Sequence, residues 1–224
     1  MQQGRRERGR FITLEGPDGA GKSSQADRLV SALRDAGSTV RQVREPGGTP
    51  LGEAVRELLM AAAPHDARSD ALLFNAARAT LVAEVIRPAL ERGEIVVCDR
   101  YADSTLAYQG HGGGLDVAEL DRINAWSTGG LVPDLTILFD VPVEQGLARR
   151  AGGPRTGRTR FEDPAYHDAA FHERVRAGYR RMAAADPARW RVIDASRSPD
   201  RVAAELLALV TAWLEKDEAV PARA

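Results

Sequence analysis

The sequence predicts an α/β fold in which helices cover both faces of a five-stranded, mostly parallel sheet. Short apolar segments alternate with helical patterns along the chain, and a glycine-rich turn separates the first apolar segment from the first helical pattern. A length of 224 residues suits one domain with a large core. Sheets of this kind bind ligands at the carboxyl ends of their strands. The expected strands are Phe11–Leu14, Thr39–Val43, Ile95–Cys98, Leu135–Phe139 and Trp190–Ile193.

Helical periodicity fills the segments between these strands. Apolar residues three or four positions apart lie on one face of each expected helix. Gly37 can end the first helix in a left-handed conformation, and Ser198 with Pro199 suits the start of the last one. The apolar faces comprise Ala26, Leu29, Val30 and Leu33; Leu51, Val55, Leu58 and Leu59; Phe74, Ala77, Leu81 and Val85; and Val202, Leu206, Leu209, Val210 and Trp213.

Charge and composition exclude several classes of protein. The formal net charge is −1, so the chain lacks the basic surface of a dedicated nucleic-acid-binding protein. We expect a flexible, arginine-rich arm over residues 1–9, a single domain over 10–215 and a flexible tail over 216–224. Cys98 is the only cysteine, and neither a secretory signal nor a membrane-spanning run is visible. These features predict a cytoplasmic protein that binds neither membranes nor nucleic acid.

The glycine-rich turn has the sequence of a phosphate-binding loop. It reads Gly-Pro-Asp-Gly-Ala-Gly-Lys-Ser over residues 16–23. Gly16 and Gly21 let backbone N–H groups turn toward one anion at a helix N-terminus, Lys22 can reach the terminal phosphates of ATP, and the Ser23 hydroxyl can bind Mg²⁺. A tight turn without a ligand is the alternative, but strand, loop and helix agree on a nucleotide site. The residues expected to bind ATP are Gly16, Pro17, Asp18, Gly19, Ala20, Gly21, Lys22, Ser23 and Ser24.

Asp99 ends the third expected strand and is a second candidate for the metal site. An acid at the end of a buried strand is the pattern of a carboxylate that organises Mg²⁺ opposite the phosphate loop, directly or through water. Asp99 could instead cap a helix. The next residue, Arg100, supplies a cation where a second phosphate would need one.

A basic segment late in the chain is a candidate lid. Five arginines lie between Arg149 and Arg160, among glycines, a proline and threonines. We expect a mobile lid over about residues 149–162, whose arginines close over phosphates. The alternative is an ordinary solvated loop.

Six segments together resemble one known family. They are Gly16 to Ser23, Arg44-Glu-Pro-Gly-Gly-Thr-Pro50, Leu73-Phe-Asn-Ala-Ala-Arg78, Asp99-Arg-Tyr101, Ser104-Thr-Leu-Ala-Tyr-Gln-Gly110 and Pro133-Asp-Leu-Thr-Ile-Leu-Phe-Asp140. In order and spacing they resemble bacterial thymidylate kinases, which are P-loop nucleoside monophosphate kinases. The resemblance runs from about residue 10 to 215. Many enzymes share the phosphate loop, whereas the second and fifth segments are far more specific to this family.

The resemblance implies a P-loop NTPase fold and phosphoryl transfer from ATP, with Mg²⁺, to dTMP. The products would be dTDP and ADP, on the route to dTTP, and the protein would form a homodimer. The implied catalytic residues are Lys22, Arg100, Asp18 and Arg160. The implied dTMP-binding residues are Arg100 and Arg56 near the phosphate, Phe74 stacked on thymine, Arg78 at O4 and Thr105 at N3, with Ser104 and Gln109 completing the pocket. Asp18 is placed near the acceptor sugar, and Glu45 near Arg100 and the metal waters.

From the residues alone, several of these assignments have plainer alternatives. The apolar neighbours of Phe74 explain it as a core residue, Arg56 could be solvated, and Glu45 could simply precede a turn. Gly19 stands where some relatives carry a basic residue, so the resemblance points to the lid for a catalytic arginine. The lid reads Thr-Arg-Phe-Glu around Arg160 and departs from the usual pattern, which leaves the roles of Arg155 and Arg158 open.

The sequence also leaves three alternative functions to consider. A kinase of the same fold could act on a different nucleoside monophosphate. A P-loop switch or assembly ATPase is the second alternative, but the chain lacks the Asn-Lys-x-Asp guanine signature, and the expected lid favours closure over a substrate. The third alternative is a nucleic-acid-binding module, but the chain has too little basic surface for that function.

Overall fold

The computed structural model describes residues 8–60, 66–151 and 168–218, which form five parallel strands in the order β2-β3-β1-β4-β5. The five predicted strands are confirmed, and all the pairings are parallel. Each strand continues one position beyond its expected end, to a charged residue. The bounds are β1 Phe11–Glu15, β2 Val40–Arg44, β3 Ile95–Asp99, β4 Leu135–Asp140 and β5 Trp190–Asp194.

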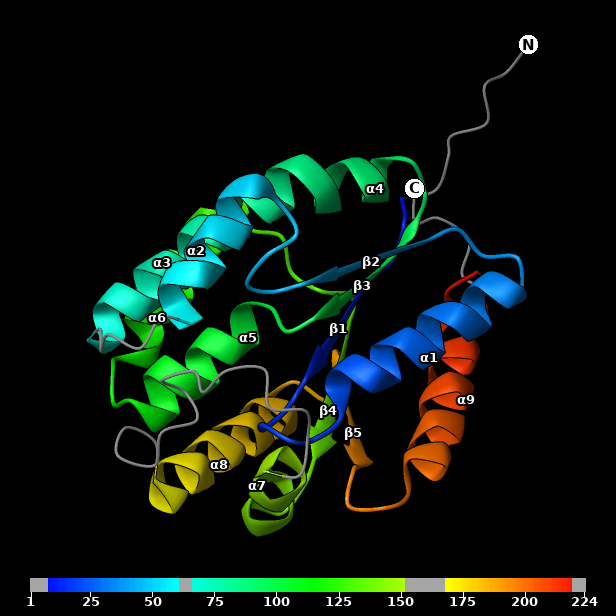
Figure 1. Cartoon of the computed structure of the whole chain (residues 1–224). Coiled ribbons are helices and arrows are strands. Elements are labelled where there is room, and N and C mark those ends of the chain that lie inside the picture. Colours follow the sequence, from blue (N-terminus) through cyan, green and yellow to red (C-terminus); the bar gives the residue numbers. More distant parts are fainter. Residues whose placement is uncertain (1–7, 61–65, 152–167, 219–224) are drawn as a thin grey trace.

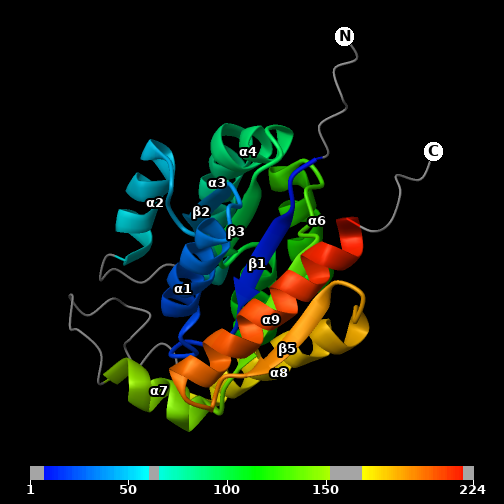
Figure 2. The ribbon, with the colours of Figure 1, turned by 90° about the vertical axis from the view of Figure 1, so that its right-hand side faces the viewer.

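Helices cover both faces of this sheet, so the predicted three-layer architecture is confirmed (Figure 1). Helices α1 and α9 pack together on one face, and Figure 2 shows them in front of the sheet. Helices α3, α4, α6 and α8 lie on the other face. The bounds are α1 Lys22–Asp35, α2 Pro50–Met60, α3 Ala67–Leu81, α4 Arg87–Glu91, α5 Ala102–Thr105, α6 Val117–Thr128, α7 Val143–Ala151, α8 Ala169–Ala185 and α9 Pro199–Glu218, with π-helical segments Val82–Ile86 and Leu106–Gly112.

Successive side chains of β1, the central strand, point to opposite faces of the sheet and enter two separate cores. Ile12 and Leu14 point into the core beneath α1 and α9, whereas Phe11 belongs to the core under η1, the π-helical segment 82–86, and α4. All three are fully buried. Thr13 bonds Thr136 of β4 through their hydroxyls at 2.9 Å, which satisfies two polar groups within the sheet.

Strand β1 lies where the sheet reverses its order, between β3 and β4. The end of β1 pairs with both neighbours: Leu14 is opposite Asp99, the last residue of β3, and Glu15 is opposite Leu138, two residues before the end of β4. Ligands bind at such switch points, outside the carboxyl ends of the strands. The loop after β1 and the residues after Asp99 therefore lie at the same edge of the sheet.

The structure corrects one expectation. In α2, Val55 and Leu59 are buried as expected, but Leu51 and Leu58 face solvent. At the two ends of the described chain, the N–H of buried Gly9 donates to Leu90 O at 2.8 Å, and α9 runs to Glu218. In the part of the chain that the structure describes, no helix is both long enough and apolar enough to cross a membrane.

Candidate functional site

The loop between β1 and α1 leaves the sheet through a backbone conformation that glycine favours. Gly16 has a φ of 143°, and a Cβ there would lie 2.5 Å from Phe139 O. The N-cap of α1 is Gly21, which has no side-chain cap. The first N–H groups of a helix have no partner within the helix. The N-terminus of α1 is therefore a suitable site for phosphate oxygens.

Lys22 folds back over this loop. Its ammonium donates to Gly16 O at 2.9 Å and to Pro17 O at 2.8 Å, and its side chain is buried. Burial, followed by the positive charge of Arg100, lowers the pKa of Lys22 to about 8. Anionic phosphate oxygens would favour the charged form, so ligand binding and protonation of Lys22 are coupled.

The structure gives a steric reason for Gly19. Its φ is 73°, and a Cβ there would lie 1.9 Å from Gly146 O in α7. Because the loop packs directly against the backbone of α7, a side chain at position 19 would require one of them to move. This contact is consistent with the expectation that a catalytic arginine comes from elsewhere.

Ser23 and Asp99 are adjacent, and their oxygen atoms suit a magnesium ion. The Ser23 hydroxyl donates to Asp99 Oδ2 at 2.5 Å. Within the described residues, the buried Asp99 Oδ1 has no hydrogen-bond partner. An unpartnered carboxylate oxygen beside a hydroxyl at the phosphate loop is a donor set that a hard cation prefers.

Asp18 is held by two arginines from different elements. Arg100 Nη2 contacts Asp18 Oδ1 at 2.6 Å, and Arg150 Nη1 of α7 contacts Oδ2 at 2.7 Å. Burial alone would raise the pKa of Asp18, but the two guanidinium groups outweigh it and hold this pKa well below the usual range. Asp18 is thus ionised, and it connects the phosphate loop to the turn after β3 and to α7.

One cavity of about 460 Å³ joins the predicted ATP site to part of the predicted acceptor site. Arg56 of α2 reaches it, with a guanidinium that is half-buried and donates to Pro46 O at 3.1 Å. Burial and then Arg44 lower the pKa of Arg56. The lining residues are Asp18, Gly19, Gly21, Lys22, Ser23, Ser24, Arg44, Glu45, Arg56, Asp99 and Arg100.

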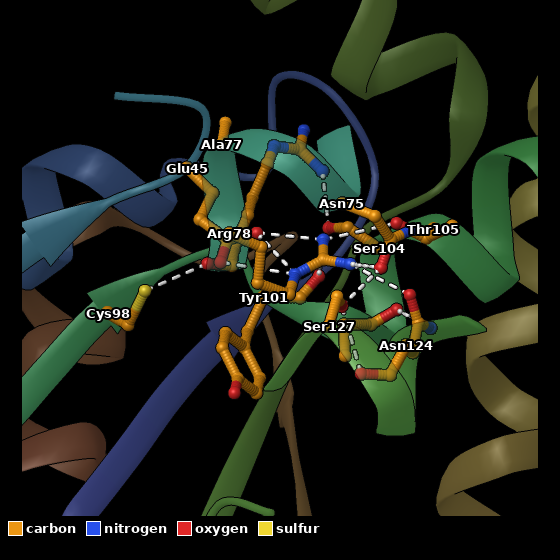
Figure 3. A network of polar contacts seen from close by, with 12 residues as sticks. Glu45, Asn75, Ala77, Arg78, Cys98, Tyr101, Ser104, Thr105, Asn124 and Ser127 are labelled. Carbon is orange, nitrogen blue, oxygen red and sulfur yellow. Dashed lines mark hydrogen bonds and ion pairs between the residues drawn. The ribbon is translucent and has the colours of Figure 1, made fainter. Parts of the chain in front are cut away.

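Arg78 is the centre of a buried polar network beside this cavity (Figure 3). Its side chain is 1% exposed and forms an ion pair with Glu45 at 2.8 Å. Nη2 also donates to Tyr101 O and to the Thr105 hydroxyl, at 3.2 and 3.1 Å. Nη1 donates to the side-chain oxygens of Asn124, at 2.8 Å, and Asn75, at 3.4 Å. These contacts fix the plane of the guanidinium.

The remaining predicted dTMP residues lie on the elements around Arg78. Phe74, one helical turn earlier on α3, packs against the buried cluster that contains Val55 and Leu59. Ser104 and Gln109 lie on α5 and on η2, the π-helical segment 106–112. The Ser104 hydroxyl accepts from Arg100 Nη1 at 3.3 Å. Glu45 pairs with Arg78, and it lines the same cavity as Arg100.

The first residues of the predicted lid are helical. Arg149 and Arg150 belong to α7, and Arg149 donates to the carbonyl of Ala195 at 2.7 Å. Arg155, Arg158 and Arg160 lie outside the described residues. Sequence reasoning missed the contact of Arg150 with Asp18, because nothing in the pattern separates it from the other arginines.

Sequence reasoning also did not identify Glu15, Asn75 and Asn124 as residues of the site. Glu15 could have been noticed as a carboxylate that ends an apolar strand immediately before the phosphate loop. The two asparagines carry no such signal, because they come together only when α3 packs against α6.

Comparisons with known proteins agree with this geometry. The family model described as thymidylate kinase matches residues 14–206. The chain belongs to the thymidylate kinase family. It is 53% identical over 211 residues to a thymidylate kinase of Thermomicrobium roseum, covering 94% of this chain and 99% of the relative. It is 52% identical to one from Deinococcus radiodurans, covering 91% and 97% of the two chains.

A solved member of the thymidylate kinase family shares the fold. The crystal structure of thymidylate kinase from Ehrlichia chaffeensis superposes with a TM-score of 0.73 at 35% identity, covering 91% of this chain and 99% of that one. The expectation of a P-loop kinase fold is thereby confirmed, with the phosphate loop and Asp99 at the carboxyl edge of a parallel sheet.

Proposed function

We propose that this chain transfers the γ-phosphoryl group of ATP to dTMP and releases dTDP and ADP. The observation that carries the proposal is the single cavity in which Lys22 and Ser23 meet Arg100 and Arg56. Phosphoryl transfer needs two anionic substrates held in line and their charge neutralised, with little covalent help from the protein. Membership of the thymidylate kinase family supports dTMP as the acceptor.

On the donor side, the loop from Gly16 to Ser24 binds the phosphates of ATP. Backbone N–H groups at the start of α1 and the ammonium of Lys22 provide the positive charge. Ser23 and Asp99 would hold Mg²⁺, directly or through water. When bound, the ion neutralises charge on the phosphate oxygens.

On the acceptor side, Arg100 and Arg56 bind the phosphate of dTMP. The ion pair with Asp18 fixes Arg100. We assign Asp18 to the acceptor sugar. Arg100 also lies with its guanidinium carbon 5.0 Å from the centroid of the Tyr108 ring. Arg100 is therefore held in place before the substrate arrives, which lowers the entropic cost of binding.

The network around Arg78 recognises thymine. Phe74 stacks on the ring, Arg78 donates to O4, Thr105 pairs with N3, and Ser104 and Gln109 complete the pocket. The network engages both Nη groups and Nε of Arg78. Thymine O4 therefore replaces one of these acceptors or shares an Arg78 N–H with it. Nη2 already donates to the Thr105 hydroxyl, the group assigned to N3.

Arg160 remains our candidate for the arginine that acts in the transition state, with Arg155 and Arg158 able to share the role. An arginine near the transferring group is a recurrent source of rate in this chemistry. The lid that carries it would follow α7, whose Arg150 already contacts Asp18. The proposed reaction, between two nucleotides of the cytoplasm, also places the chain in that compartment.

We also propose that the chain forms a homodimer whose interface consists of helices α2, α3 and α6. These helices are neighbours and expose Leu51, Leu58, Leu72 and Trp126, of which Trp126 is 86% exposed. Large apolar side chains exposed on neighbouring helices are consistent with a protein interface. We expect the wild-type protein to sediment as a dimer and Leu58→Glu to shift it toward monomer. A wild-type monomer at micromolar concentration would contradict this assembly.

Product analysis tests the proposed reaction. The purified protein should convert MgATP and dTMP to ADP and dTDP in equal amounts, because the phosphoryl group passes directly between them. Chromatographic separation of the four nucleotides measures this balance. ADP and inorganic phosphate without dTDP would indicate an ATPase and would contradict the proposal.

A further inference from the structure

Glu15 is a buried carboxylate to which the proposed function assigns no role. It is the last residue of β1 and is fully buried. Its Oε1 accepts the N–H of Tyr101 at 2.7 Å, and its Oε2 accepts the hydroxyls of Ser104 and Tyr179 at 2.7 and 2.9 Å. The donors come from the turn after β3, from α5 and from α8. An isolated carboxylate would not be retained in this position without such partners.

These contacts fix the turn that carries Arg100. Arg100 has a φ of 69°, a left-handed conformation that few non-glycine residues adopt and that the surroundings must enforce. Its own N–H donates to Leu14 O at 3.0 Å, and the next N–H, of Tyr101, donates to the Glu15 side chain. Two consecutive amides of the turn are therefore held by the end of β1.

Tyr179 closes this cluster from the other side. Its hydroxyl lies 2.8 Å from the Ser104 hydroxyl, which in turn accepts from Arg100 Nη1. Burial, with a smaller contribution from Asp103, raises the pKa of Glu15 to about 7, and the hydrogen bond from Ser104 opposes this. Loss of one donor would make the protonated form more favourable, and a protonated Glu15 cannot accept all three hydrogen bonds as the carboxylate does.

We propose that Glu15 and Tyr179 form a positioning pair that holds the Arg100 turn in the conformation that binds the acceptor phosphate. The inference rests on the proposed function, because it takes Arg100 as the group that contacts that phosphate. Neither residue touches the reacting atoms. They act through the backbone at positions 100 and 101 and through the Ser104 hydroxyl.

Tyr179→Phe is the most selective test, because it removes one hydroxyl and leaves the ring. We expect the KM and the dissociation constant for dTMP to rise about tenfold, as for the loss of one hydrogen bond to a charged group. The KM for ATP should stay within about twofold, because the phosphate loop is untouched. Steady-state kinetics and titration calorimetry with dTMP alone and with ATP alone measure both effects. Glu15→Gln should act in the same direction and more strongly.

Thr13→Val is the matched control. It also removes one buried hydroxyl, which lies 2.9 Å from the Thr136 hydroxyl within the sheet, but it leaves the three donors of Glu15 in place. We expect a comparable loss of melting temperature with an unchanged KM for dTMP. In an Arg100→Met background, Tyr179→Phe should have no further effect on kcat/KM for dTMP, because the pair acts through Arg100.

The outcomes separate this inference from the proposed function. A wild-type protein that neither binds nor phosphorylates dTMP overturns the proposed function and the inference with it. A wild-type protein that uses dTMP, together with a Tyr179→Phe variant of unchanged dTMP affinity, overturns the positioning pair alone. Equal losses for ATP and dTMP, or additive effects in the Arg100→Met background, overturn it as well.

Discussion

Replacing Lys22 by methionine should lower kcat about 100- to 1,000-fold while the protein remains folded. The ammonium of Lys22 lies at the phosphate loop, bonded to two of its carbonyls, where charge develops during phosphoryl transfer. Its removal leaves those carbonyls without this donor but takes no group from the apolar core. Steady-state rates with saturating dTMP, alongside a thermal melt of each protein, measure the two effects separately.

The lowered pKa of Lys22 predicts that ATP binding depends on pH. Burial holds the pKa of Lys22 at about 8 in the free protein, so its charge is lost as the pH rises through that value. The affinity for ATP should therefore fall between pH 7 and pH 9, and Lys22→Met should remove most of this dependence. A Lys22→Met protein with wild-type kcat, or with the wild-type pH dependence, would contradict the assignment of Lys22.

Replacing Glu45 by alanine should destabilise the fold by about 3 to 5 kcal/mol. The ion pair with Arg78 is almost completely buried, with the two side chains 4% and 1% exposed. Without Glu45, the Arg78 guanidinium keeps its charge in the interior and loses its only anionic partner in the described network. Urea unfolding followed by circular dichroism gives the change in free energy.

A double variant separates stability from base recognition. Glu45→Leu combined with Arg78→Met removes both charges, and we expect it to regain most of the lost stability. It should still use dTMP poorly, because the donor for O4 is gone. The interpretation fails if Glu45→Ala unfolds at the wild-type urea concentration, or if the double variant keeps wild-type kcat/KM for dTMP.

The sequence predicted the strands and the phosphate loop well, because both are local. Each strand ended within one residue of its expected end, since a charged residue follows the last apolar residue in every case. The prediction of the apolar face of α2 was less accurate. Periodicity placed Leu51 and Leu58 in the same stripe as Val55 and Leu59, but it cannot separate a core stripe from an exposed one.

Side-chain partners in the site could be predicted only in part. Arg78 was placed in the base pocket by its motif, but its partners Glu45 and Asn124 are 33 and 46 positions away. Glu45 lies directly after β2, and Asn124 reaches Arg78 only because α6 packs against α3. Tyr179 is 164 positions from Glu15, with no pattern that relates the two. The predicted roles in substrate binding, and those of Arg155, Arg158 and Arg160, stay predictions.

A comparison of acceptors tests the central claim most directly. Initial rates of ADP release with MgATP should be measured against dTMP, dUMP, dCMP, dAMP and dGMP at equal concentrations, with a blank that contains no acceptor. We predict that dTMP is used far faster than dCMP or either purine nucleotide, because Arg78 offers donors where cytosine carries an amino group and the contacts assigned to Phe74, Arg78 and Thr105 match thymine. Equal rates across the panel, or ADP release that does not depend on an acceptor, would contradict the account.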